Sequence, residues 1–211
     1  MSQFLPLFPL QIVVFPGEDL NLHIFEPRYK ELINDCEEEG ITFGIPAYID
    51  KRLMKVGTEV MLSSIEKRYD NGELDIKTKG QRLFTVEEFQ PVAPNKLYAG
   101  GEIEWLELEA DEQFLGNEKI LDLTRELFQL LNIQKKLPED SKDFSTFDVA
   151  HHVGLSLEQE YQLLCLLGAA ERQQFLIDHL ERLLPMVKEM ENLKKKAQLN
   201  GHFKHLNPPN I

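Results

Sequence analysis

Cysteine is nearly absent from this chain of 211 residues, which has only Cys36 and Cys165, far apart and in no CxxC spacing. Two such cysteines provide neither a disulfide framework nor a paired-cysteine metal site, and they fit small buried side chains in a reducing compartment. Basic residues are also in the minority, with 23 Lys and Arg against 36 Asp and Glu and a net charge of −13. Because this charge repels phosphate backbones, we expect no nucleic-acid partner.

The chain also lacks an apolar run of the length that crosses a membrane, about 20 residues. Its longest stretch without a charged side chain, residues 1–17, is interrupted by Pro6, Pro9 and Pro16. No Lys or Arg precedes the apolar part of this stretch and no small-residue cleavage site follows it, so it does not match a signal peptide. We therefore expect a cytoplasmic protein with no membrane partner.

The common catalytic and phosphate-binding motifs are missing as well. The sequence contains no GxxxxGK[ST], no GxSxG and no HExxH. His151 and His152 are adjacent, and successive helical residues point about 100° apart, so the two do not readily share a metal ion. His202 and His205 have a ligand-like spacing but no third ligand nearby. We expect no catalytic residue, no cofactor and no metal site.

Residues 1–110 contain a series of short extended segments with one helix among them. The prolines of "LPLFPL" are typical of an edge or entry strand, and Asn71-Gly72 favours the positive φ angles of a tight hairpin turn. The expected strands are "LPLFPL", "QIVVFPG", residues 20–24, "ITFGIPAYI", the hairpin within residues 57–80, "RLFTVEEF" and "YAGGEIEWL". Short strands at this spacing predict a compact barrel or two packed small sheets.

The helix expected in this half is "EPRYKELINDCEEEG", which begins near Pro27 and ends at Gly40. Its apolar side chains recur at helical spacing, at Tyr29, Leu32, Ile33 and Cys36.

Residues 111–200 have the pattern of a helical lobe that ends in a long helix, and residues 201–211 are expected to be a flexible tail. Ser145 and Asp148 are placed to cap a short helix, and Ser156 and Gln159 have the spacing of a capping box at the start of the next. The last helix has apolar residues at heptad-like spacing. It could pair with a second copy of the chain, but packing within the lobe is the stronger expectation.

The segment "HIFEPRY" is the candidate binding site. Phe25, Arg28 and Tyr29 combine an apolar ring, a forked cation and an amphipathic ring where a strand joins a helix. Aromatic and Arg side chains dominate protein interfaces, so this set could grip a peptide. The competing interpretation is that Glu26 and Pro27 start the helix and the rings pack inward, as apolar rings beside turns usually do.

Three stretches of the chain resemble the Lon N-terminal domain family, the substrate-binding region of the ATP-dependent protease Lon. They are "FLPLFPLQIVVFPGEDLNLHIFEPRY", "KVGTEVMLSS" and "GELDIKTKGQRLFTV", and in the third Gly80 and Arg82 match the Gly-x-Arg pattern of the family. The "HIFEPRY" form is similar to that of stand-alone members. Residues 147–185 resemble, more loosely, the helical half that follows in the same family.

The resemblance implies an α+β fold, with a PUA-like β-barrel lobe over residues 1–110 followed by an all-α helical lobe over residues 111–200. It also implies a region that recognises unfolded or tagged proteins. The sequence has no Walker motif and no Ser-Lys protease dyad. No catalytic residue is therefore carried over from the family.

These observations favour a non-enzymatic protein- or peptide-binding module with a role in protein quality control. Its expected partners are unfolded or extended protein segments, with a protease or a chaperone as a further candidate. An apolar groove between the lobes, or an exposed patch on one lobe, would hold such segments. Two alternatives stay open: a small-molecule enzyme whose site is assembled from scattered residues, and an RNA-binding PUA-like protein.

Overall fold

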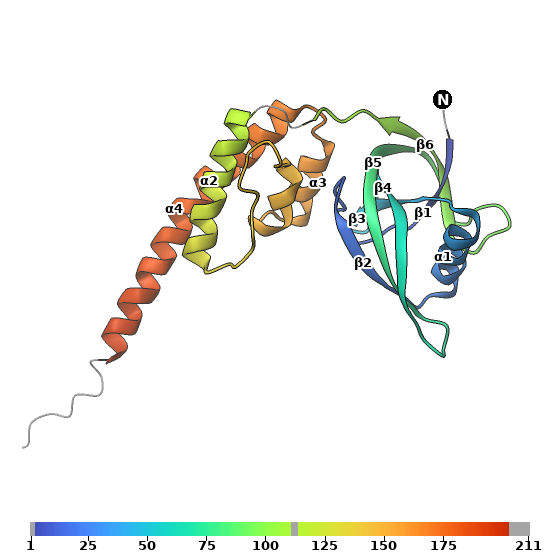
Figure 1. Ribbon diagram of the computed structural model, residues 1–211, viewed down its shortest axis with the longest axis horizontal. Coiled ribbons are helices and arrows are strands. Elements are labelled where there is room, and N and C mark those ends of the chain that lie inside the picture. Colours follow the sequence, from blue (N-terminus) through green and yellow to red (C-terminus); the bar gives the residue numbers. More distant parts are fainter. Residues whose placement is uncertain (1–2, 111–113, 203–211) are drawn as a thin grey trace, which may run out of the picture.

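A computed structural model describes residues 3–110 and 114–202 (Figure 1). Strands fill the first part of the chain and helices the second, which confirms the expected α+β architecture. The strands are β1 (Gln3–Leu7), β2 (Asp19–Ile24), β3 (Phe43–Ile49), β4 (Arg52–Arg68), β5 (Leu74–Gln90) and β6 (Ala99–Leu106). The helices are α1 (Pro27–Glu39), α2 (Phe114–Leu131), the 3-10 helix η1 (Thr146–His152), α3 (Leu157–Cys165) and α4 (Ala169–His202). The tail expected at residues 201–211 lies outside the described residues from residue 203 onward.

The six strands form one sheet in the order β2-β5-β4-β3-β1-β6, and β5 also pairs with β6, which closes the sheet into a barrel. Strand β1 lies between β3 and β6, so of the two predictions drawn from its prolines, an edge strand or an entry strand, the edge strand is wrong. It meets the parallel strand β3 at one residue pair, Leu7 and Gly44. Proline is tolerated here because few backbone N–H groups are needed on that side.

Residues 11–17 form no strand, contrary to the sequence-based prediction. Val13, Val14 and Phe15 are nevertheless buried. The segment is held by isolated contacts, among them a hydrogen bond from the Thr58 hydroxyl to the Val14 carbonyl. A buried apolar run held in this way has the same sequence pattern as a strand, which explains the wrong prediction.

Strand β5 is one element of 17 residues where two strands were expected, because Gly80 lies within it without ending it. The hairpin before it is confirmed, with Gly72 at a φ of 76°. Asn71 is not in the left-handed region. The turn is closed by hydrogen bonds from Tyr69 N to Glu73 O and from Gly72 N to Tyr69 O, both 2.9 Å.

Helix α1 matches its prediction closely. It begins at Pro27 and ends at Gly40, which adopts a left-handed conformation with a φ of 68°. The predicted apolar face, made of Tyr29, Leu32, Ile33 and Cys36, is buried against the barrel core.

The helical lobe is built around α2 and α4, which lie side by side and run in the same direction (Figure 1). Ion pairs of 2.6 Å join Lys119 to Glu181 and Glu126 to Lys188. Val187 is still buried, whereas Met190 is exposed, and the end of α4 projects beyond the rest of the lobe. Within the described parts of the chain, no helix is both long and apolar enough to span a membrane.

Candidate functional site

The two lobes meet at the turn formed by residues 15–18, which follows the uncharged opening of the chain. Gly17 N donates to Gly80 O at 3.0 Å, and Gly80 N donates to Glu18 O at 2.8 Å. A Cβ atom on Gly80 would lie 2.2 Å from the Phe15 carbonyl oxygen, a distance that no real Cβ contact reaches. Glycine at position 80 therefore lets the turn lie directly on β5.

Arg82, the other residue of the Gly-x-Arg pattern, holds neighbouring strands together. Its guanidinium lies 3.7 Å from the centre of the Trp105 ring of β6, and its Nε donates to Glu59 of β4 at 2.9 Å. The two residues therefore differ in role: Gly80 allows the turn of residues 15–18 to approach β5 closely, whereas Arg82 links β5 to β4 and β6.

On the helical side, η1 supplies the residues that contact this turn. The ring of Phe147 stacks on Phe15, with centroids 4.9 Å apart and planes inclined by 19°. Ser145 and Asp148 form the predicted capping box at the start of η1. Because the cap fixes the first turn of the helix, it also sets the position of Phe147 against the barrel.

His151 joins the lobes by ion pairs. Its Nδ1 lies 2.8 Å from Glu160 Oε1 on α3, and its Nε2 lies 3.2 Å from Glu18 Oε2 in the barrel turn. Burial by itself lowers the pKa of His151, but the hydrogen bonds to Glu160 and Glu18 outweigh it and raise the pKa to about 9. The imidazole is therefore a cation at neutral pH, held between two carboxylates.

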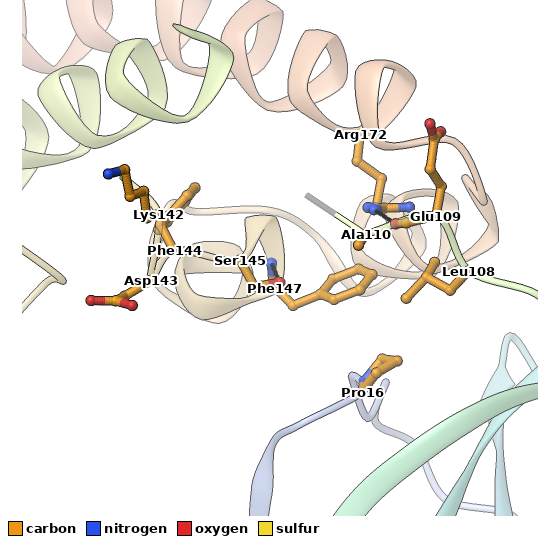
Figure 2. Close-up of a pocket in the computed structure, with 10 residues that line it drawn as sticks. All are labelled: Pro16, Leu108, Glu109, Ala110, Lys142, Asp143, Phe144, Ser145, Phe147 and Arg172. Carbon is orange, nitrogen blue, oxygen red and sulfur yellow. Dashed lines mark hydrogen bonds between the residues drawn. The ribbon is translucent and has the colours of Figure 1, made fainter. Parts of the chain in front are cut away.

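Two hollows at this junction are lined by both Pro16 and Phe147. The apolar hollow has a volume of about 600 Å³ and includes Leu108, Ala110 and Phe144 in its wall. Figure 2 shows Pro16 on one side of it and Leu108, Phe147 and Arg172 on the other. The polar hollow has a volume of about 420 Å³ and is lined by ionisable side chains, among them Glu18, Asp19, Lys135, Asp148, His151 and His152.

Both hollows are lined by Pro16, Ser145 and Phe147, so they adjoin each other. We call the two together the interlobe groove. It has an apolar end and an ionisable end. An extended polypeptide could place apolar side chains at one end and polar groups at the other.

Arg172 of α4 organises the wall of the apolar hollow. The side chain is fully buried, and its guanidinium donates to the carbonyl oxygens of Glu109, Leu166 and Leu167 at 2.5, 3.0 and 2.8 Å. It also lies 5.3 Å from the centre of the Phe147 ring. Sequence reasoning missed Arg172 because nothing in "AAERQQF" distinguishes it from a surface arginine.

The three residues predicted as a peptide site lie outside this groove and do not share one environment. Phe25 is 59% exposed, and Arg28 is exposed in an ion pair of 2.8 Å with Glu26. Tyr29 is only 6% exposed and stacks on Phe8 in the barrel core, with ring centroids 3.6 Å apart. The guanidinium of Arg28 lies 4.5 Å from the centre of the Tyr29 ring.

Among the described residues, no group of three or more His, Cys, Asp or Glu side chains is arranged to hold a metal ion. His205 of the pair considered above lies outside those residues. Cys36 is buried and Cys165 half-buried, and neither is in a disulfide.

Comparisons with solved structures agree with this architecture. The chain is similar to a Lon N-terminal domain protein from Xanthomonas campestris, with 28% identity, a TM-score of 0.59 and coverage of 87% of this chain and 98% of that one. It shares its fold with the N-terminal domain of a Lon protease from the Mycobacterium avium complex, with 17% identity, a TM-score of 0.61 and coverage of 85% and 98%. No match was found among curated proteins. Residues 4–182 match the substrate-binding domain of the ATP-dependent protease La (Lon), and the chain therefore belongs to the Lon substrate-binding domain family.

Proposed function

We propose that this protein is a non-enzymatic module that binds extended or unfolded polypeptide segments in the interlobe groove. The observation that carries the proposal is the apolar hollow at the lobe junction, formed by Pro16 from the barrel and by Leu108, Phe144 and Phe147. Membership of a substrate-binding family supports a polypeptide as the occupant, since the substrates of a protease are polypeptides. An adaptor role beside a protease or chaperone in the cytoplasm belongs to the same proposal.

The residues at the strand-to-helix joint form a second, outer contact in this proposal. Phe25 offers an exposed ring, and Arg28 offers a cation on the same segment. The guanidinium of Arg28 lies over the buried ring of Tyr29, and this cation–π contact helps to position Arg28.

Binding of a permanently unfolded probe tests the proposal. We suggest reduced and carboxymethylated α-lactalbumin carrying a fluorescent label, followed by fluorescence anisotropy. Leu108→Gln keeps most of the side-chain volume but places an amide in the apolar hollow, so we expect the affinity to fall about fivefold. Val92→Gln is the matched control, because Val92 is 63% exposed and lies outside the groove.

Equal affinities for Leu108→Gln and the parent protein, with both folded, would contradict the placement of the site in the groove. The absence of saturable binding to any unfolded probe would contradict the proposed function itself. Urea unfolding of each variant separates a loss of affinity from a loss of fold.

A further inference from the structure

Strand β2 has a single partner in the barrel. It lies at one end of the strand order and pairs only with β5, through six consecutive residue pairs from Asp19–Lys79 to Ile24–Leu74. This ladder has no register shift, whereas the ladders between β3 and β4 and between β5 and β6 contain one each and the ladder between β4 and β5 contains three. Among the described residues, no strand pairs with the other edge of β2.

The direction of the backbone groups on β2 follows from the hydrogen bonds to β5. The Leu20 carbonyl faces β5, where it accepts a hydrogen bond of 3.1 Å from the Thr78 hydroxyl. The Glu18 carbonyl, two residues earlier, accepts from Gly80 N. Since backbone groups alternate in an antiparallel pair, Asp19, Asn21 and His23 direct their N–H and C=O groups toward the open edge.

This edge lacks three features that commonly protect edge strands. Residues 19–24 contain no proline, no lysine and no β-bulge. Leu20 and Leu22 pack on the barrel core but are only half-buried. Leu20 and Leu22 are therefore partly exposed at the unpaired edge of the sheet, and an added strand would cover them.

The edge also continues the interlobe groove. Glu18 and Asp19 line the polar hollow, and Asp19 is the first residue of β2. Figure 1 shows β2 on the side of the barrel that faces the helical lobe. At its far end the strand leads directly to the exposed ring of Phe25. A chain that leaves the polar hollow at Asp19 can therefore continue along β2.

We propose that β2 binds an extended segment of a polypeptide substrate by strand addition, with hydrogen bonds to the backbone of Asp19, Asn21 and His23. This inference rests on the proposed function and specifies how the substrate is held. The segment is extended and about six residues long, with apolar side chains at alternate positions facing Leu20 and Leu22. Main-chain pairing suits a module that accepts many sequences, because every residue except proline carries the same N–H and C=O groups.

The continuity with the groove favours a substrate segment over a second copy of this chain. An edge of six residues is about 20 Å long. Two such edges bury far less surface than the roughly 1,200–2,000 Å² of a stable protein interface.

Asn21→Pro tests the proposal, because it removes one outward N–H group at an edge that pairs with no further strand among the described residues. Proline is tolerated on an edge strand whose N–H faces solvent, so the fold should survive. We expect the affinity for carboxymethylated α-lactalbumin to fall about tenfold, from the lost hydrogen bond and the clash of the ring with the incoming strand. Asn21→Ala is the matched control, since it changes the side chain but keeps the N–H group, and should bind within about twofold of the parent protein.

Amide hydrogen exchange of the parent protein gives a second measurement that needs no variant. The amides of Asn21 and His23 should become protected when the probe saturates the protein. Unchanged exchange at both amides, or full affinity of folded Asn21→Pro, would overturn strand addition. If Leu108→Gln still weakens binding in that case, the proposed function stands without it. A dimer detected by light scattering and dissociated by Asn21→Pro would instead assign the edge to a second copy, and would also overturn the inference.

Discussion

At the scale of single residues, Gly80 shows how one missing side chain sets the lobe junction. Gly80→Ala would place a methyl group 2.2 Å from the Phe15 carbonyl oxygen, so the turn of residues 15–18 must move away from β5. We expect a loss of about 2 kcal/mol in the free energy of unfolding, as for other overpacked buried positions. Urea unfolding measures it, with Lys79→Ala as the control because Lys79 is exposed on the same strand. Equal free energies of unfolding for the two variants would show that the turn can move away from β5 without a loss of stability.

His151 makes a prediction about pH. Its pKa is about 9 in the folded protein, above the ordinary value of 6.5, so the folded state binds the proton more tightly than the unfolded state. The stabilising contribution of His151 is therefore complete below about pH 6.5 and is lost as the pH rises through 9. Urea unfolding should give a larger difference between the parent protein and His151→Gln at pH 6.5 than at pH 9.5.

His152→Gln is the control for this titration. Burial is the largest cause of the lowered pKa of His152, so its own titration lies below 6.5. Its effect on stability should change much less than that of His151→Gln between pH 6.5 and 9.5. A difference for His151→Gln that does not change with pH would mean that the ion pairs with Glu18 and Glu160 contribute nothing.

At the scale of elements, the helical lobe depends on caps that the sequence displays. Ser156 accepts a hydrogen bond from Gln159 N, and the Gln159 side chain accepts one of 2.9 Å from Ser156 N. Ser156→Ala should lower the free energy of unfolding by about 1 kcal/mol, because the first turn of α3 loses a partner for its N–H group. Ser156→Asp should restore most of this loss, and thermal unfolding monitors both variants. A neutral Ser156→Ala would indicate that tertiary contacts alone fix the start of α3.

The elements that could be predicted are those whose signals are local. Helix α1 carries its start at Pro27, its end at Gly40 and its buried face within 14 residues, and all three agree with the structure. Residues 11–17 and the continuity of β5 through Gly80 were predicted wrongly because their partners lie far away in the sequence. An apolar run in the sequence does not show whether the segment pairs as a strand or is buried as an irregular segment.

The candidate site was harder to predict, because its residues are also far apart in the sequence. The sequence places Phe25 and Tyr29 four residues apart, but only the fold buries Tyr29 on Phe8 and leaves Phe25 exposed. A groove between the lobes was anticipated in general terms. Its residues were not, because Pro16, Leu108 and Phe147 come together only when the lobes pack.

At the scale of the whole molecule, a closed barrel and a helical lobe are joined through the turn of residues 15–18, η1 and α3. The aromatic stack of Phe15 on Phe147 and the ion pairs of His151 lie at this joint. The interlobe groove and the open edge of β2 begin at the same place. In the proposed function, an extended chain would occupy this surface across both lobes.

Site-specific cross-linking tests this account most directly. A photoreactive p-benzoylphenylalanine replaces Ala110, an exposed residue that lines the apolar hollow, or Val92, an exposed residue that lines neither hollow. Each protein is irradiated with carboxymethylated α-lactalbumin, and the products are separated by mass. The account predicts cross-links from position 110 that excess unlabelled probe competes away, and none from position 92. Cross-links from position 92 alone, or equal and uncompeted cross-links from both positions, would contradict it.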